Sequence, residues 1–329
     1  MKPFIGITMG DPAGVGPEVI LRALERAELF EICRPIIIGN MEIIGDAARV
    51  CGASMLINKL DDSLEGRYVD GAVNVIDIAG IDLGLFEKGK TSGICGEAAF
   101  KYIEKAVSLA VDGRIKAIAT APVNKESLKL AGVPYIGHTE MLQGLTGVED
   151  PLTMFQVDSL RIFFLSRHVS LRKACDYITS DKVFETIEKS HKALLRLGVV
   201  DPRIAVAALN PHGGEHGMFG GEEIQHIEPG IKKARSAGYI VEGPVPADSV
   251  FYFALQGRYD GVISLYHDQG HIAAKMHDFE KTVSITNGLP FLRTSVDHGT
   301  AFDIAGNGIA NGTSMYEAIK LAAEYSEYY

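Results

Sequence analysis

Short runs of Ile, Val and other apolar residues alternate along this chain with longer amphipathic stretches, and this alternation limits the fold more than any other feature. The apolar runs that predict strands lie at residues 4–9, 35–38, 73–76, 115–120, 162–165, 204–209, 261–265 and 283–286. Helical patterns lie between them at residues 18–29, 97–111, 182–197 and 228–237. Strands that are apolar on both faces need helices on both sides, so the pattern predicts an α/β fold with a largely parallel sheet.

The length, charge and cysteine content of the chain narrow its possible functions. Its 329 residues predict two domains. The net charge of −10 offers no basic surface for a phosphate backbone, so we expect no nucleic-acid partner. No stretch approaches the roughly 18 apolar residues that a membrane span needs, so we expect no membrane partner either. The four widely spaced cysteines indicate reduced thiols, and together these features predict a cytoplasmic protein.

Residues 298–311, with the sequence HGTAFDIAGNGIAN, predict a dinucleotide-binding loop. Their small side chains let the backbone pass close to a flat ligand. Asp303 offers a carboxylate that can accept hydrogen bonds from a ribose diol and would repel a 2′-phosphate, which favours NAD over NADP. Taken alone, such a segment is as typical of a surface loop. Ser314 and Glu317 predict a capping box at the start of the last helix, just after this loop.

The same segment resembles, nearly residue for residue, the adenosine-binding loop of the isocitrate/isopropylmalate dehydrogenase superfamily. In that superfamily an acidic residue followed by Ile is typical of NAD use, and Asp303-Ile304 matches that pattern. The resemblance implies that NAD is held by His298, Gly299, Asp303, Ile304 and Asn311.

Three of the ten histidines follow predicted strands within a few residues, namely His168, His212 and His267. Because the carboxyl ends of parallel strands meet at one edge of a sheet, these imidazoles are placed to converge. Three protein ligands with open positions are typical of a catalytic metal site, although each histidine alone is as consistent with a structural role. His267 and His271 also have the spacing of a zinc-protease helix. We reject that interpretation, because no Glu follows His267 and Gly270 weakens a helix there.

Longer motifs carry a second resemblance, which covers nearly the whole chain. They are TMGDPAG at 8–14, TAPVNK at 120–125, GHTE at 137–140, NPHGGE at 210–215, GPVPAD at 243–248, HDQG at 267–270 and LPFLRTSVDHGT at 289–300. With these motifs the chain resembles the 4-hydroxythreonine-4-phosphate dehydrogenase family of vitamin B6 biosynthesis. The resemblance implies a two-domain fold like that of the isocitrate/isopropylmalate dehydrogenases, with a cleft between the domains. Residues 1–130 and 296–329 would form the cofactor-side domain, and 131–295 the metal, substrate and dimerisation domain.

The family resemblance also implies roles for single residues. A divalent metal (Zn, Mg, Mn or Co) would bind to His168, His212 and His267, in a homodimer whose subunits both contribute to the metal site. Substrate would be held by His138, Thr139, Lys275, Ser284 and Arg293. Arg and Lys suit a phosphorylated acid, because Arg presents a planar fork of donors and Lys adds a point charge. The proton-transfer residue stays open among Asp248, Asp268 and Lys125, and the two aspartates are alternatively partners that orient the histidines.

Two departures from the family pattern bear on the substrate. Ser284 stands where the vitamin B6 enzymes carry an Asn that contacts substrate, and His271 stands where they carry an apolar residue. A second branch, which acts on 4-phospho-D-threonate or 4-phospho-D-erythronate, resembles the chain better. We therefore predict NAD- and metal-dependent oxidation of the C3 hydroxyl of such an acid, then decarboxylation to dihydroxyacetone phosphate. The alternatives are the vitamin B6 enzyme itself, a metal-dependent phosphatase, and a non-catalytic sensor of a phosphorylated acid.

Overall fold

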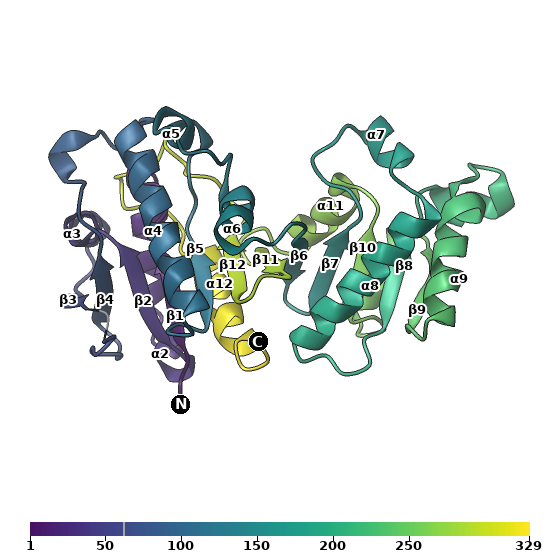
Figure 1. The fold of residues 1–329 in the computed structure, drawn as a ribbon, viewed down its shortest axis with the longest axis horizontal. Helices are drawn as coiled ribbons and strands as arrows, with labels where there is room; N and C mark the ends of the chain where they lie inside the picture. The colour runs from purple at the N-terminus through teal and green to yellow at the C-terminus, as the bar shows by residue number, and fades with distance from the viewer. Residues whose placement is uncertain (62) are drawn as a thin grey trace. The chain divides into compact units, whose positions relative to one another are not determined.

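The structure is a computed structural model that describes residues 1–61 and 63–329, and the chain divides into two compact units (Figure 1). Unit 1 comprises Met1–Pro151, Val283–Glu327 and Tyr329, and unit 2 comprises Leu152–Thr282 and Tyr328. Each unit combines a mostly parallel sheet with covering helices, so the predicted α/β class is confirmed. Within the described residues, no helix is both long and apolar enough to cross a membrane.

Unit 1 is built on a sheet with the strand order β3-β4-β2-β1-β5-β12-β11. The strands are β1 (Phe4–Thr8), β2 (Arg34–Gly39), β3 (Leu56–Leu60), β4 (Ala72–Asp77), β5 (Ala117–Thr120), β11 (Val283–Asn287) and β12 (Leu292–Val296). Neighbouring strands are parallel except β11 and β12, which are antiparallel. The middle strands β1, β2 and β5 are almost entirely buried, which explains why they are continuous apolar runs in the sequence.

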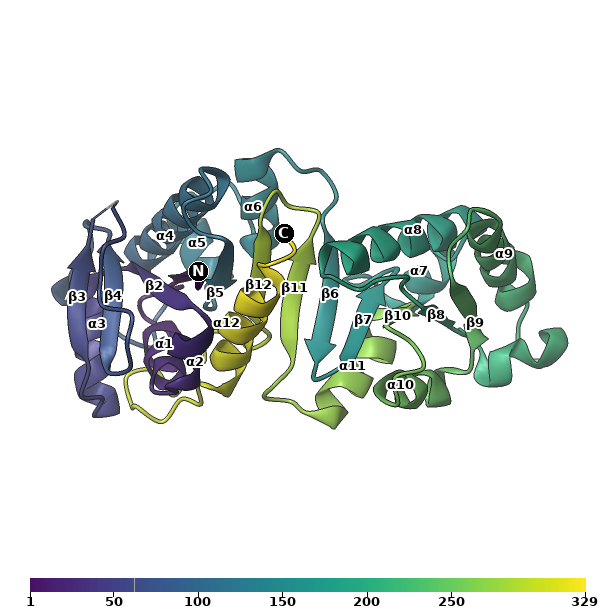
Figure 2. The same ribbon diagram turned by 90° about the horizontal axis from the view of Figure 1, so that it is seen from below.

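Helices cover both faces of the unit 1 sheet (Figure 2). One face carries α1 (Gly16–Leu24), α2 (Glu28–Ile32), α3 (Met41–Cys51) and α12 (Thr313–Tyr325), and the other carries α4 (Gly93–Val111), α5 (Lys125–Leu130) and α6 (His138–Thr146). A short 3₁₀ turn spans Leu83–Leu85. The single helix expected over residues 18–29 is therefore two helices, α1 and α2.

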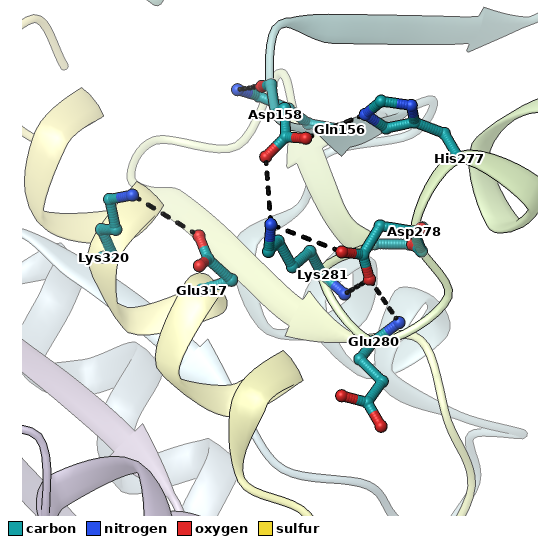
Figure 3. Close-up of polar contacts among 9 residues, drawn as sticks. Gln156, Asp158, His277, Asp278, Glu280, Lys281, Glu317 and Lys320 are labelled. Carbon is teal, nitrogen blue, oxygen red and sulfur yellow. Dashed lines mark hydrogen bonds and ion pairs between the residues drawn. The ribbon is translucent and has the colours of Figure 1, made fainter.

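The start of α12 differs from the predicted capping box. Gly312 is the N-cap, and the side chain of Asn311 accepts a hydrogen bond from the Thr313 backbone N–H at 2.9 Å. Ser314 lies buried inside the first turn, so it cannot act as the cap. Glu317 instead forms an ion pair with Lys320 at 3.7 Å (Figure 3). The capping-box prediction is wrong because the helix begins at Thr313 with Gly312 as its N-cap, so Ser314 already lies inside the helix.

Unit 2 contains a sheet with the strand order β6-β7-β10-β8-β9. The strands are β6 (Leu152–Val157), β7 (Leu160–Phe164), β8 (Ile204–Ala207), β9 (Val241–Val245) and β10 (Gly261–Ser264). All neighbours are parallel except the β6–β7 hairpin. Helices α8 (Ser180–Arg196) and α9 (Glu228–Ser236) cover one face, and α10 (Ala247–Leu255) and α11 (His267–His277) cover the other (Figure 2). The remaining elements are α7 (Leu171–Asp176), a 3₁₀ segment at Pro211–Gly217 and a π-helical turn at Glu223–Ile227.

The unit boundaries fall at 151/152 and 282/283, whereas the expected domain boundaries were 130/131 and 295/296. Strand pairing explains the difference on the carboxyl side. Strand β12 pairs in parallel with β5, and β11 pairs with β12, so both strands belong to unit 1. Helix α6 also belongs to unit 1, where it packs against α4.

Helix α11 forms although Gly270 lowers the helix propensity there, so the zinc-protease interpretation fails for want of a Glu after His267 and not for want of a helix. A Cβ atom at position 270 would lie 2.6 Å from Ser264 Oγ and 2.7 Å from Phe164 Cε1. Both neighbours belong to the sheet beneath the helix. Glycine is therefore required for α11 to pack closely on β7 and β10, and this contact outweighs its poor helix propensity.

We predict that Gly270→Ala lowers the free energy of unfolding by about 1–3 kcal/mol, because the added methyl group overpacks this contact. Gly45→Ala is the matched control, since Gly45 lies inside α3 and a Cβ there would meet only Ile57 Cδ1, at 4.0 Å. The control should be neutral or stabilising by up to about 1 kcal/mol. Urea unfolding of both variants measures the difference, and equal stabilities would contradict the packing argument.

Candidate functional site

The three predicted metal-binding histidines lie at one edge of the unit 2 sheet. His168 follows β7, His267 is the first residue of α11 after β10, and His212 lies in the segment after β8. Strand β10 pairs in parallel with both β7 and β8, so the three strands end at the same edge. Ligands of α/β proteins bind at this carboxyl edge.

His267 has the environment of a metal-binding imidazole. Its Nδ1 lies 2.6 Å from Asp268 Oδ1, and its ring centroid is 6.0 Å from that of His168. With Nδ1 bonded to a carboxylate, Nε2 is the nitrogen that can bind a metal ion, and such a carboxylate–histidine pair is typical of metal sites. A cavity of about 410 Å³ opens here, lined by Arg167, His168, Val169, Ser170, Leu171, Ala174, Tyr266, His267 and Asp268.

His271, one turn along α11, stacks beneath His267 with 3.8 Å between the ring centroids. Its own ring is buried against Phe155 and Phe164, at centroid distances of 4.3 and 4.9 Å. Burial lowers the pKa of His271 to about 4, with a smaller contribution from His267. His271 is therefore a neutral imidazole whose ring stacks against the ring of His267.

His212 lies apart from this pair. It is exposed, and it begins a run of six residues with positive φ, His212 having a φ of 54°. Throughout residues 1–61 and 63–329, no three His, Cys, Asp or Glu side chains are grouped closely enough to hold a metal ion. The structure thus brings His168 and His267 together, while the complete set of three stays a prediction.

Helix α11, which begins with His267, is also held at its carboxyl end (Figure 3). His277 Nε2 lies 2.8 Å from Asp158 Oδ2, in the turn of the β6–β7 hairpin. Lys281 Nζ lies 3.8 Å from Asp158 Oδ1 and 3.4 Å from Asp278 Oδ2. The contacts of His277 and Lys281 with Asp158 join the end of α11 to the hairpin, so the helix that presents His267 is tied to the sheet at a second place.

Two buried side chains that the sequence analysis did not single out hold the strand ends beside the histidines. Gln269 bridges the segments that follow β8 and β10, and Glu223 accepts hydrogen bonds from the backbone of Leu209 and Asn210. Gln269 belongs to the HDQG motif, so its position was visible. Its partners are backbone groups, one of them 61 residues away in sequence, which no motif reveals.

Arg293, a predicted substrate residue, is buried on β12 in unit 1. Its Nε and Nη2 donate to Thr120 Oγ1 at 3.1 and 2.7 Å, and its Nη1 donates to Thr286 Oγ1 at 3.1 Å. In the β11–β12 register, Arg293 lies opposite Thr286 and Ser295 lies opposite Ser284. Since alternate residues share a face, Ser284, Thr286 and Arg293 all lie on one polar face of the sheet.

His138 begins α6 in the same unit, and Thr139 follows it. Its Nε2 is enclosed and has no hydrogen-bond partner among the described residues. Burial lowers the pKa of His138 well below 6.5, and the positive charge of Arg293 lowers it further. Lys125, the exposed first residue of α5, passes beside Gly137, because a Cβ at that glycine would lie 3.8 Å from Lys125 Cε. Unit 1 therefore pairs a buried guanidinium with a neutral imidazole.

Side chains of α1 form hydrogen bonds to the backbone of the predicted cofactor loop at 298–311. The buried carboxylate of Glu18 accepts hydrogen bonds from Gly306 N at 2.6 Å and from Gly308 N at 2.8 Å. Arg22 Nη2 donates to Gly308 O at 3.0 Å. Asp303 is exposed, so its carboxylate is open to a ligand. The role of Glu18 leaves no sequence motif, because it depends on backbone groups nearly 300 positions away.

The remaining predicted residues divide between the units. His298, Gly299, Ile304 and Asn311 belong to unit 1, and His298 Nδ1 lies 2.9 Å from Gly299 O. Asp248 and Lys275 belong to unit 2, where Asp248 is exposed in the first turn of α10. Lys275 Nζ lies 5.2 Å from the centre of the Phe279 ring. Unit 2 thus carries the predicted metal ligands, and unit 1 the predicted cofactor loop and most of the predicted substrate residues.

A family model described as pyridoxal phosphate biosynthetic protein PdxA matches residues 31–322. The chain belongs to the PdxA family. A relative from Clostridium botulinum (strain Langeland), named "Putative D-threonate 4-phosphate dehydrogenase", is 56% identical over 325 residues, which are 99% of this chain and 97% of that protein. A relative of the same name from Fusobacterium nucleatum is 54% identical over 326 residues, 99% of this chain and 98% of that protein.

A solved structure of 4-hydroxythreonine-4-phosphate dehydrogenase from Klebsiella pneumoniae is also similar to this PdxA-family chain. It has 40% identity and a TM-score of 0.91, and the match covers 99% of this chain and 98% of that one. The family predicted from the motifs is confirmed. Because these relatives are named dehydrogenases, the chain is an oxidoreductase.

The low pKa of His138 predicts how stability depends on pH. Above pH 6.5 the histidine is neutral in both the folded and the unfolded chain. As the pH falls below that value, the unfolded chain takes up a proton that the folded chain does not, so the fold loses stability. We expect His138→Asn to lose less free energy of unfolding than the wild type between about pH 7 and pH 5. Urea unfolding across this range measures it, and an identical loss in both proteins would contradict the assignment.

Proposed function

We propose that this PdxA-family chain oxidises the C3 hydroxyl of a four-carbon hydroxy acid that bears a 4-phosphate, with NAD as oxidant, and that the resulting β-keto acid loses CO₂. The proposed substrate is 4-phospho-D-threonate or 4-phospho-D-erythronate, and the product is dihydroxyacetone phosphate. The observation that carries the proposal is the buried Arg293 guanidinium, on one sheet face with Ser284 and next to the neutral His138. Such a group suits a phosphate or carboxylate.

The proposed cofactors are NAD and one divalent metal ion, Zn, Mg, Mn or Co. His168, His212 and His267 would hold the metal, and the Asp268 carboxylate on His267 Nδ1 supports this assignment because it leaves Nε2 for the ion. The glycine loop, with the exposed Asp303, would hold the NAD ribose. When bound, the metal would polarise the substrate hydroxyl and NAD would accept the hydride.

The chain's own residues have separate tasks in this proposal. Arg293, His138, Thr139 and Lys275 hold the substrate, and Ser284 contacts its C2 substituent. Asp268 orients His267, as their 2.6 Å contact favours. Proton transfer is left to Asp248 or Lys125, both exposed on helix amino-terminal turns.

Ser284 supports a hydroxy acid in preference to an amino acid as substrate. A Ser hydroxyl can both donate and accept a hydrogen bond, and its short side chain leaves room for a C2 hydroxyl. A mismatched polar group in such a place is costly, so a single residue can separate the two substrate classes. The names of the Clostridium and Fusobacterium relatives support the same choice.

We predict NAD reduction with 4-phospho-D-threonate or 4-phospho-D-erythronate, measured by absorbance with Mg²⁺, Mn²⁺, Co²⁺ or Zn²⁺ added. Ser284→Asn should shift kcat/KM toward 4-phosphohydroxy-L-threonine by at least about tenfold, because the polar partners then suit an amino group better. Preference of the wild type for the amino acid would instead assign the vitamin B6 reaction.

Asp303→Ala separates the dehydrogenase from the hydrolase alternative in the same assay. A dehydrogenase should show a KM for NAD raised by about tenfold or more, because a hydrogen-bonding carboxylate is lost. A phosphatase would release inorganic phosphate without NAD, and its turnover would not depend on Asp303. A sensor would bind the acid and never reduce NAD.

The proposed enzyme is a homodimer, and α11 offers a surface for it. Ile272 and Met276 on this helix, and Phe279 just beyond it, are 61%, 80% and 65% exposed. The four-residue spacing of Ile272 and Met276 places both on one side of the helix that also presents His267, and Phe279 follows the end of that helix. A second copy of the chain that covers this apolar stripe would lie beside the predicted metal ligands, in keeping with a site to which both subunits contribute.

We predict that Met276→Asp converts the dimer to a monomer of 35.5 kDa, because a buried unpaired carboxylate is costly. The control is Val200→Asp, at an equally exposed position outside the stripe, 82% accessible. Light scattering at matched concentrations measures the masses. A wild-type monomer, or an unchanged mass for Met276→Asp, would refute this interface.

A further inference from the structure

In unit 2, side-chain hydrogen bonds link the segments that follow β7, β8 and β10, which lead to the three histidines. Ser166 Oγ, after β7, donates to Leu265 O at 2.8 Å. Gln269 Oε1 accepts from Leu265 N, and Gln269 Nε2 donates to Ala208 O, both at 2.8 Å. One buried amide therefore joins the backbone after β10 to the backbone after β8, and Ser166 extends the link to β7.

Glu223 continues this link toward His212. Its Oε1 accepts hydrogen bonds from Leu209 N at 2.8 Å and Asn210 N at 2.7 Å, and its Oε2 accepts from Asn210 Nδ2 at 2.8 Å. The Glu223 side chain is buried, with 1% of the residue exposed, so these three donors offset the loss of its hydration. Together, Gln269 and Glu223 bind the backbone of three consecutive residues just before Pro211-His212.

These bonds occur where the strand ladder ends. After β8 and β10, Ala208 N still donates to Val245 O of β9 at 2.7 Å, but Ala208 O and Leu265 N need other partners. Ala208 O and Leu265 N find theirs in one side chain, which sets the two segments at a fixed separation. His267 lies two residues after Leu265 and His212 four residues after Ala208, so the bridge controls the two backbone segments that carry them.

We propose that Gln269 and Glu223 are positioning residues that fix the backbone presenting His212 and His267 and thereby set the affinity for the divalent metal. This inference rests on the proposed metal-dependent function. Neither side chain is a metal ligand in the proposal. Both act through backbone groups, in the way that outer-shell partners of metal ligands commonly change affinity by about 10- to 100-fold.

The first test is Gln269→Met, which keeps the length of the side chain and removes both hydrogen bonds. Gln256→Met is the matched control, because Gln256 is exposed at the end of α10. We expect the dissociation constant for Zn²⁺ or Mn²⁺ alone, measured by calorimetry, to rise at least about tenfold in Gln269→Met and to stay within about twofold in the control. A folded Gln269→Met variant with wild-type metal affinity would overturn the proposal.

A second pair of variants tests the proposal even if Gln269→Met does not fold. Glu222 and Glu223 both contact Asn210 Nδ2 at 2.8 Å, but of the two only Glu223 has hydrogen bonds to the backbone of Leu209 and Asn210 in the described contacts. Glu223→Met, which removes the oxygen that accepts from both backbone N–H groups, should therefore weaken metal binding several-fold, and Glu222→Met should not. Equal effects of the two variants would count against the proposal.

Hydrogen exchange separates failure of this inference from failure of the proposed function. In metal-free protein, Gln269→Met should speed exchange in residues 208–212 and 265–267 and leave the loop at 298–311 unchanged. If the wild type binds neither Zn²⁺ nor Mn²⁺, the proposed metal-dependent function is wrong, and so is the proposed effect of Gln269 on metal affinity. Faster exchange at these two segments would then still support the role of Gln269 in positioning the backbone. Unchanged exchange there would overturn that role as well.

Discussion

Backbone N–H and C=O groups must be hydrogen-bonded when they are buried, and this requirement shapes the carboxyl edge of each sheet. Inside a parallel sheet the ladder satisfies them, but at the edge the chain turns away and the ladder ends. In unit 2 the missing partners are supplied by Gln269 and Glu223, and the residues thus fixed lead directly to predicted metal ligands. The same solution recurs in unit 1, where Glu18 binds the backbone of Gly306 and Gly308 in the predicted cofactor loop. Loops that need a defined shape for binding are held by buried polar side chains.

The sequence predicted best those parts of the fold whose cause is burial. Strands β1, β2 and β5 are buried along almost their whole length, so the sequence shows each of them as an apolar run. Strand β12 is equally buried but has the sequence LRTSV, because its polar side chains serve the face that holds Arg293. Helix α11 escaped prediction for a similar reason: Gly270 lowers helix propensity, yet close packing on Ser264 and Phe164 requires it. In β12 and α11, prediction failed because polar side chains or a glycine stand where an apolar residue or a helix former is usual.

The candidate site shows the same division. Residue types and motifs placed His168, His212 and His267 after strands, and the strand order β7-β10-β8 puts those strands side by side. The distances were beyond the sequence, and the structure pairs His267 with Asp268 and His168 without bringing in His212. Glu18, Glu223 and Gln269 could not be assigned from one sequence, because their partners are backbone groups. A backbone partner leaves no mark on the identity of the residue that carries it.

The phosphorylated acid proposed as substrate needs local positive charge, which the chain's net charge of −10 does not provide. Unit 1 offers it by burying Arg293 and binding its guanidinium to the hydroxyls of Thr120 and Thr286, which fix its direction without cancelling its charge. Burial lowers the pKa of His138 and the Arg293 charge lowers it further, so its neutral imidazole can accept as well as donate a hydrogen bond. In the proposed site, one buried cation therefore attracts the anionic substrate and reinforces the neutral state of its neighbour. Selectivity between hydroxy and amino acids can then rest on uncharged groups such as Ser284, which lies on the same face.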